Sequence, residues 1–235
     1  MEQRSTTQVS VIFLILTCIF VACLLITNVV AGRLIQLFGM TLTADLFLFP
    51  IVYIFGDVLT EVYGFQRARL TIWLGFAANL LMALVFMFII TLPYPDFWEH
   101  NNAYNTVLGF TPRLVLASLI AYFVGEFSNS IILSRMKLIT AGRWLWTRTI
   151  GSTIVGEGID TFIFMLIAFG GTYSMPIFLS MILAQYLWKV GYEVAATPLT
   201  YLFVGWLKKK EGIDTFDHGV KYNPFKLKVD KVKAL

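Results

Sequence analysis

Charged residues are scarce in this chain: they make up 14% of its 235 residues, while 58% are hydrophobic. A soluble domain carries roughly 25% charged residues, so this composition excludes a soluble enzyme. The mean hydropathy of +0.76 and the 16% of aromatic residues exclude a disordered or fibrous chain as well. The sequence therefore predicts an integral membrane protein.

Cysteine and histidine are also rare, with two of each. Cys18 and Cys23 lie five positions apart on separate faces of one apolar run, which argues against a disulfide. His100 and His218 lie in polar connections, so neither metal-ligand spacing nor an intramembrane serine or zinc protease is indicated. The sequence also has no phosphate-binding glycine loop. We expect no metal and no cofactor.

Long apolar runs predict an all-α fold with six membrane-spanning helices and room for little else. A membrane helix needs about 20 apolar residues. We expect residues 92–112 to form a loop at the water interface and residues 134–148 a short interfacial segment. A basic tail follows at 207–235, and the whole chain, 1–235, forms one transmembrane domain. The expected spans are 9–30, 44–64, 69–92, 113–134, 149–170 and 175–206.

Lysine and arginine are distributed unevenly between the two ends of these spans. With the N-terminus inside, 15 of them lie on the cytoplasmic side and only Arg33 and Arg113 on the other. The positive-inside rule then predicts that both termini are cytoplasmic. The net charge of +4 is explained by this distribution of lysine and arginine. We therefore expect the protein to interact with the lipid bilayer and not with nucleic acid.

Six acidic residues fall inside the expected spans, where a charge costs at least roughly 2.5–3.5 kcal/mol at the bilayer centre. So many acids are expected to face a shared interior. Neutral amides at Asn28 and Asn129 and the amine of Lys189 lie at similar depth, and Lys189 is expected to neutralise Glu193, one turn later. The acids are Asp57, Glu61, Glu126, Glu157, Asp160 and Glu193.

The acids recur in a short pattern in which a glycine precedes the acid and a polar residue follows three positions later. It occurs at Gly56-Asp57, Gly125-Glu126 and Gly156-Glu157. Small residues let membrane helices approach closely. The second and fifth spans are three apart in order, as a 3+3 inverted repeat with a midplane site would require.

Two other interpretations of the acids stay open. Polar groups between membrane helices often only hold a bundle together, at about 0.6 kcal/mol per interaction. An intramembrane aspartyl hydrolase would need two acids that share a proton, a role that Asp57 and Asp160 could fill.

Two blocks of the sequence resemble the queuosine precursor transporter (VUT) family. One runs from Gly56 to Phe65 (GDVLTEVYGF) and continues with Arg67, Arg69 and the run WLGF from Trp73. The other comprises WLWTRTIGST from Trp144 and GEGIDT from Gly156. The likeness extends from Asn28 to about Pro198. It implies a bacterial inner-membrane transporter of six helices, without enzyme activity, that imports 7-cyano- or 7-aminomethyl-7-deazaguanine or queuine.

A small planar nucleobase of this kind suits buried acids. A carboxylate can accept hydrogen bonds from the ring N–H and the exocyclic amine of a deazaguanine edge, and aromatic rings can sandwich its plane. Desolvated carboxyls also suit proton-linked or gradient-linked transport, beside facilitated transport. The expected substrate-binding residues are Asn28, Asp57, Glu61, Glu126, Asn129, Glu157 and Asp160; the expected gating or ion-pair residues are Arg67, Arg69, Arg148, Lys189 and Glu193.

Two further possibilities remain open at this point. The chain could be a substrate-binding subunit that depends on separate ATPase partners, as in vitamin-uptake modules. A homo-oligomer is also compatible with the sequence.

Overall fold

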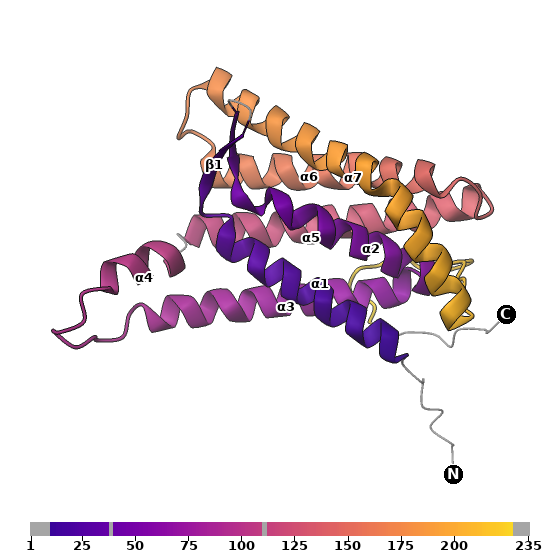
Figure 1. The fold of residues 1–235 in the computed structure, drawn as a ribbon, viewed down its shortest axis with the longest axis horizontal. Coiled ribbons are helices and arrows are strands. Elements are labelled where there is room, and N and C mark those ends of the chain that lie inside the picture. The colour runs from indigo at the N-terminus through magenta and orange to yellow at the C-terminus, as the bar shows by residue number, and fades with distance from the viewer. Residues whose placement is uncertain (1–9, 38–39, 110–111, 228–235) are drawn as a thin grey trace, which may run out of the picture.

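A computed structural model describes residues 10–37, 40–109 and 112–227 of the chain. Long helices run back and forth between the two ends of a bundle, and α1 begins at the end where α7 finishes (Figure 1). The elements are α1 Val11–Val30, β1 Leu34–Leu37, β2 Met40–Thr43, the 3-10 helix η1 Ala44–Phe47, α2 Phe49–Tyr63, α3 Phe65–Ile89, α4 Asn101–Leu108, α5 Pro112–Ile139, α6 Leu145–Phe169 and α7 Met175–Glu211.

Four helical stretches within the described residues are long and apolar enough to cross a membrane. The six expected spans correspond in position to α1, α2, α3, α5, α6 and α7, but α2 and α7 do not meet these criteria. α2 has only 15 residues, about 23 Å of helix, and the 37-residue α7 contains buried charges. The chain is a multi-pass membrane protein. The four stretches are α1, α3, α6 and a stretch whose described helical residues are those of α4 and α5.

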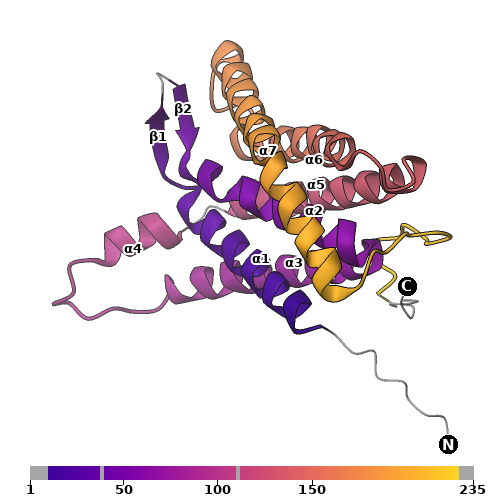
Figure 2. The ribbon, with the colours of Figure 1, turned by 45° about the vertical axis from the view of Figure 1, so that its right-hand side comes forward.

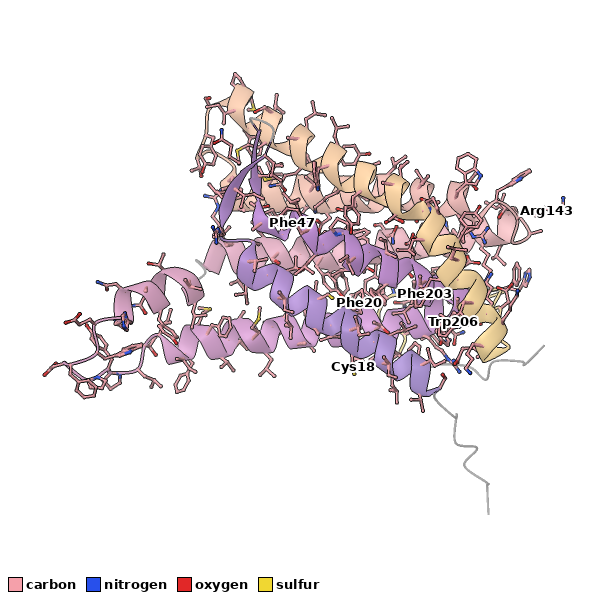
Figure 3. All side chains as sticks on the ribbon, viewed as in Figure 1. Cys18, Phe20, Phe47, Arg143, Phe203 and Trp206 are labelled. Atoms are coloured by element: carbon pink, nitrogen blue, oxygen red, sulfur yellow. The ribbon has the colours of Figure 1, made fainter. Side chains whose placement is uncertain are left out.

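The short helix α2 lies at the centre of the bundle. It contacts α1, α3, α5 and α7, and every residue from Gly56 to Tyr63 is buried. Its surroundings are therefore protein rather than lipid. The neighbouring α1 has two distinct faces: Phe20 points into the bundle and Cys18 points out of it (Figure 3).

The chain is helical almost throughout, as predicted, with one small addition: two short β-strands pair as a hairpin between α1 and α2. β1 and β2 are antiparallel, with Leu34 opposite Thr43 and Leu37 opposite Met40. Residues 44–47 then form the 3-10 helix, so α2 begins at Phe49 instead of at residue 44. The hairpin stands at the end of the bundle opposite the start of α1, near α4 (Figure 2).

Two expected connections are also more regular than predicted. Residues 92–112 include the helix α4, Asn101–Leu108, so they are not only a loop. The expected interfacial segment, residues 134–148, instead consists of the last turns of α5, a tight turn and the first turn of α6. The turn requires a left-handed backbone at Ala141, Gly142 and Trp144, and it makes α5 and α6 an antiparallel pair.

The residues after α7 fold back across one end of the bundle. Thr215 donates its backbone N–H to the carbonyl of Val62, 3.1 Å away. Asp217 accepts a hydrogen bond from the backbone N–H of Phe65 at 2.9 Å and another from Ser134 at 2.5 Å. This C-terminal segment, residues 212–227, therefore joins α2, α3 and α5, a role that the expected basic tail did not include.

We expect Asp217→Ala to lower the free energy of unfolding by about 0.5–2 kcal/mol, because Asp217 accepts from a first-turn N–H of α3 as a helix cap does. The change is measured as a lower thermal unfolding temperature in detergent. Lys221→Ala, at an exposed position of the same segment, is the control. An equal temperature for both variants would show that Asp217 does not hold the segment in place.

Candidate functional site

Buried charged side chains gather between α2, α5, α6 and α7. Each is at most 5% exposed, although together they bring five acids and one amine into the interior. The structure thus brings together most of the acids expected from the sequence. They are Asp57 from α2, Glu126 from α5, Glu157 and Asp160 from α6, and Lys189 and Glu193 from α7.

Lys189 is the cation of this acid cluster. Its Nζ lies 3.0 Å from Oε2 of Glu157 and 3.1 Å from Oδ2 of Asp160, and it sits 3.7 Å from the centroid of the Phe49 ring. The expected pairing with Glu193 is wrong, because Lys189 projects toward α6 and its amine is taken up by two acids there. One amine therefore faces two carboxyl groups.

Asp57 has a different partner, because Asn129 Nδ2 donates to its Oδ1 at 2.7 Å. One turn further along α2, Thr60 and Ser130 share a hydrogen bond of 2.8 Å. These contacts join α2 to α5. An aspartyl hydrolase would need Asp57 and Asp160 to share a proton. The structure instead gives these two carboxyls separate partners, Asn129 and Lys189.

The three glycines of the recurring pattern bring the helices into close contact. A Cβ at Gly125 would lie 2.7 Å from the Cβ of Asp160 and 3.1 Å from the carbonyl oxygen of Gly156, and one at Gly156 would lie 2.7 Å from the Cβ of Asn129. A Cβ at Gly56 would collide with the carboxyl of Glu126. The acids therefore lie where the helix backbones approach each other closely.

A cavity opens beside the acid cluster, toward the end with the β-hairpin. Its outer part holds about 210 Å³ and has a largely apolar lining that includes Met82, Phe164 and Tyr173. Its inner part holds about 40 Å³ and is lined by polar groups and aromatic rings. Asn28, Ala31, Ser118 and Phe164 line both parts, so the two adjoin each other. The inner part also includes Asp45, Phe49, Tyr122, Asp160, Thr161, Gln185 and Lys189.

Asn28 forms the polar wall between the two parts. Its Nδ2 donates to Oδ1 of Asn79 at 3.0 Å, and its Oδ1 accepts from Ser118 Oγ at 2.6 Å. The side chain is thus held from α3 and α5. On the opposite side, Gln185 donates to Thr43 of the hairpin at 3.2 Å.

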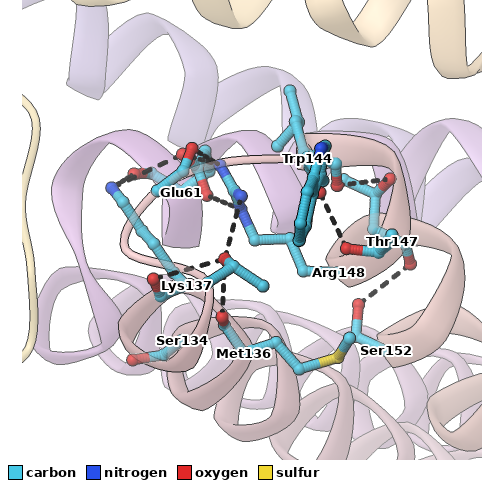
Figure 4. A network of polar contacts seen from close by, with 12 residues as sticks. Glu61, Ser134, Met136, Lys137, Trp144, Thr147, Arg148 and Ser152 are labelled. Carbon is cyan, nitrogen blue, oxygen red and sulfur yellow. Dashed lines mark hydrogen bonds and ion pairs between the residues drawn. The ribbon is translucent and has the colours of Figure 1, made fainter.

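Glu61 does not line this cavity; it belongs to a second ion cluster, with Arg148 and Lys137 (Figure 4). Arg148 binds it through two parallel hydrogen bonds of 2.7 and 2.8 Å. Lys208 lies 2.6 Å and Lys137 3.5 Å from its Oε1. Among the residues expected to bind substrate, Glu61 is therefore the one that already has a full set of cationic partners.

Asp214 of the C-terminal segment completes this second cluster, 2.5 Å from Lys137 and 2.9 Å from Lys208. Burial alone raises the pKa of the Asp214 carboxyl, but the hydrogen bonds from the two lysines outweigh it and hold the pKa below its ordinary value. Its contribution to stability is therefore present above the unfolded pKa and is lost as the pH falls through the folded one.

The two remaining arginines of the gating group hold the ends of α2 and α3. Arg67 lies over the rings of Phe13 and Tyr63, at 5.8 and 5.7 Å. Arg69 donates to the carbonyl of Asn223 at 3.0 Å and lies over the ring of Phe65. Both arginines therefore lie with Arg148 at the end that the C-terminal segment covers.

Several residues of the site were not among those selected from the sequence. Ser118, Tyr122 and Glu126 are spaced by four residues, so they share one face of α5, and this spacing could have identified Ser118. Thr161 directly follows Asp160 in the GEGIDT run. The sequence offered little indication of the residues around Glu61, because Lys137, Lys208 and Asp214 lie far from it in the chain.

Comparison with known proteins places the chain among transporters. Residues 43–203 match the family model described as "Putative vitamin uptake transporter". A protein of Bacillus subtilis named "Probable queuosine precursor transporter" is 31% identical over 74% of this chain and 76% of its own length. The queuosine precursor transporter of Escherichia coli is 28% identical over 57% of this chain and 58% of its own length. No solved structure matches the chain.

Proposed function

Because this chain belongs to the vitamin uptake transporter family, and is thus a multi-pass transporter of the bacterial inner membrane rather than an enzyme, we propose that it imports queuosine precursors. The observation that carries the proposal is the two-part cavity that ends at Asp160 and Lys189. The names of its relatives from Bacillus subtilis and Escherichia coli support the substrate class.

The chemistry of the cavity suits a 7-deazaguanine. Its outer part holds about 210 Å³ and its inner part about 40 Å³, together below the roughly 300–1,000 Å³ of sites for drug-sized ligands, so it suits a small ring system. Asp160 can accept the ring N–H and the exocyclic amine of the base, while Asn28 and Gln185 offer amides on either side. The rings of Phe49, Tyr122 and Phe164 are available to stack on the flat base.

Other residues that the sequence predicted to bind substrate contact the groups that line the cavity or lie next to them. Glu157 shares Lys189 with Asp160, and Asn129 holds Asp57. Lys189 neutralises one of the two acids of α6, so the cavity keeps an excess of negative charge. This excess favours the bases whose 7-substituent carries a protonated amine, 7-aminomethyl-7-deazaguanine and queuine, over the neutral 7-cyano base.

We propose six spans, with α2 and α7 crossing inside the bundle where protein covers their charges. Both chain ends then lie in the cytoplasm, and α2 and α6 run in opposite directions, as a 3+3 inverted repeat requires (Figure 1). In this orientation the cavity opens to the outside. The Glu61 cluster and the C-terminal segment close the cytoplasmic end, where Arg67, Arg69 and Arg148 serve as gate residues.

We expect Asp160→Asn and Lys189→Met each to lower the uptake of labelled 7-aminomethyl-7-deazaguanine at least tenfold, because each removes one member of the pair at the end of the cavity. Uptake is measured in cells that cannot make the base, and membrane insertion is checked by immunoblot. Asp96→Asn, at an exposed position in a connection, is the matched control. Uptake at the control level in both variants would remove the pair from the binding site.

A substrate-binding subunit with separate ATPase partners is the competing proposal. The purified chain alone in liposomes separates the two. Entry of labelled base without partners supports an autonomous carrier, whereas binding without entry supports the subunit.

A further inference from the structure

Glu126 is a buried acid that faces away from the substrate cavity. Its side chain is 1% exposed, and neither carboxyl oxygen has a hydrogen-bond partner within the described residues. It borders a narrow gap between α1, α2 and α3, lined by Phe20, Gly56, Thr71 and Ile72 among others. The substrate cavity reaches Tyr122, one turn earlier on α5, but does not include Glu126.

Acidic side chains lie around Glu126, and no lysine or arginine among the described residues pairs with it. α6 contributes Glu157 and Asp160, and α2 contributes Asp57 and the Tyr53 hydroxyl, which also has no partner. On α7, Glu193 acts on the neighbouring Asp57 and has no hydrogen-bond partner within the described residues, and Lys189 is bound by the two acids of α6. α1 and α3 face it with Phe20, Ala68, Thr71 and Ile72.

An ionised carboxyl in such a place has neither water nor a counter-charge, and its acidic neighbours repel it further. The neutral acid avoids both penalties. We propose that Glu126 binds the proton that drives substrate transport in this protein. It holds the proton in the outward-open state described above and releases it when the helices move and the carboxyl reaches cytoplasmic water.

The packing next to Glu126 links this proton site to the substrate site. Gly125 precedes Glu126 and lies against Asp160 and the carbonyl oxygen of Gly156, at contact distances that leave no room for a side chain. On its other side, the Glu126 carboxyl fills the space beside Gly56 of α2. A shift of α5 that exposes Glu126 therefore also displaces Asp160, so proton and substrate change their access together.

The geometry favours a proton over sodium as the bound ion. Sodium sites in transporters typically include backbone carbonyls that an interrupted helix has freed. α5 is continuous from Pro112 to Ile139, and α2 and α6 are continuous past Gly56 and Gly156, so these carbonyls are engaged within the helices. What the cluster offers is a carboxyl, which binds a proton covalently.

This inference rests on the proposed function and is tested with purified full-length protein in liposomes. The probe is labelled 7-cyano-7-deazaguanine, because a neutral base is not trapped by a pH gradient as an amine would be. Two reactions are compared: exchange of the base across the membrane without a gradient, and its accumulation when the outside is acidic. A pH-sensitive dye inside the liposomes reports proton entry during accumulation.

We expect the unmodified protein to accumulate the base at least fivefold under the pH gradient, with acidification inside. Glu126→Gln should keep exchange within about twofold and lose accumulation and acidification. Glu126→Asp, which retains a carboxyl, should restore both in part. Glu99→Gln, the same substitution at an exposed position, should match the unmodified protein.

The other outcomes contradict the proposal in separable ways. Accumulation by Glu126→Gln at the normal level, or loss of its exchange as well, would overturn the role of Glu126. Accumulation by the unmodified protein under a sodium gradient alone, or base entry without acidification, would overturn proton coupling even if the variant does not fold. An absence of exchange in the unmodified protein would overturn the proposed function itself, and the coupling with it.

Discussion

Replacing Glu61 with alanine is expected to lower the free energy of unfolding by about 3–5 kcal/mol, the cost of breaking a buried ion pair from one side. Glu61 is the common partner of Arg148, Lys137 and Lys208. Without it the two lysines keep the half-buried Asp214, and Arg148 keeps only hydrogen bonds to neutral groups of the turn between α5 and α6. The Arg148 and Lys137 side chains are 1% and 3% exposed, so water cannot replace the lost carboxylate.

The measurement is thermal or denaturant unfolding in detergent, with Glu99→Ala as the control for loss of an exposed carboxylate. The double change Glu61→Leu with Arg148→Met replaces the strongest pair by apolar groups. It should recover part of the stability, because it leaves fewer buried charges unpaired. If Glu61→Ala and Glu99→Ala unfold at the same temperature or denaturant concentration, the ion cluster around Glu61 does not stabilise the folded protein.

Gly156→Ala is expected to lower the free energy of unfolding by about 3 kcal/mol, the upper end for overpacking a tight core. The added methyl group would lie 2.7 Å from the Cβ of Asn129 and 3.2 Å from the carbonyl oxygen of Gly125. Neither atom is the end of a flexible side chain, so α5 and α6 must move apart. This separation would also break the alignment of Asn129 with Asp57, and uptake should fall at least tenfold.

The matched control is Gly191→Ala in α7, where an added Cβ meets nothing within 4 Å. Alanine favours a helix over glycine by roughly 0.5–1 kcal/mol, so this variant should be as stable as the unmodified protein or slightly more. Both variants are compared by folded yield on size exclusion and by uptake. Equal yields would mean that the contact between α5 and α6 relaxes more easily than its geometry indicates.

The order and approximate limits of the long helices could be predicted from sequence, because apolar runs of about 20 residues are a strong signal. The gathering of the acids followed from their spacing and from the energetic cost of placing a charge in lipid. The roles of the individual residues stay predictions, since placement alone does not show which carboxyl touches a base.

What the sequence could not give depends on contacts between distant residues. Lys189 and Glu193 are one turn apart, and the local pairing appeared natural, but the direction of Lys189 is set by how α7 packs on α6. The β-hairpin at residues 34–43 is too short to show a clear alternation. The C-terminal segment reads as a polar, basic stretch, and only the fold shows that Asp217 meets the start of α3.

The pairing of Glu61 with Lys208 has a consequence for biosynthesis. The two residues are 147 positions apart, and a ribosome adding about 5–20 residues per second needs about 7–30 s to cover that distance. During this interval α2 has already been made while one of its counter-ions does not yet exist. The last counter-ion of Glu61 is therefore made after the other two. Until α7 has been synthesised, the acids of α2 must either stay protonated or remain within the insertion machinery.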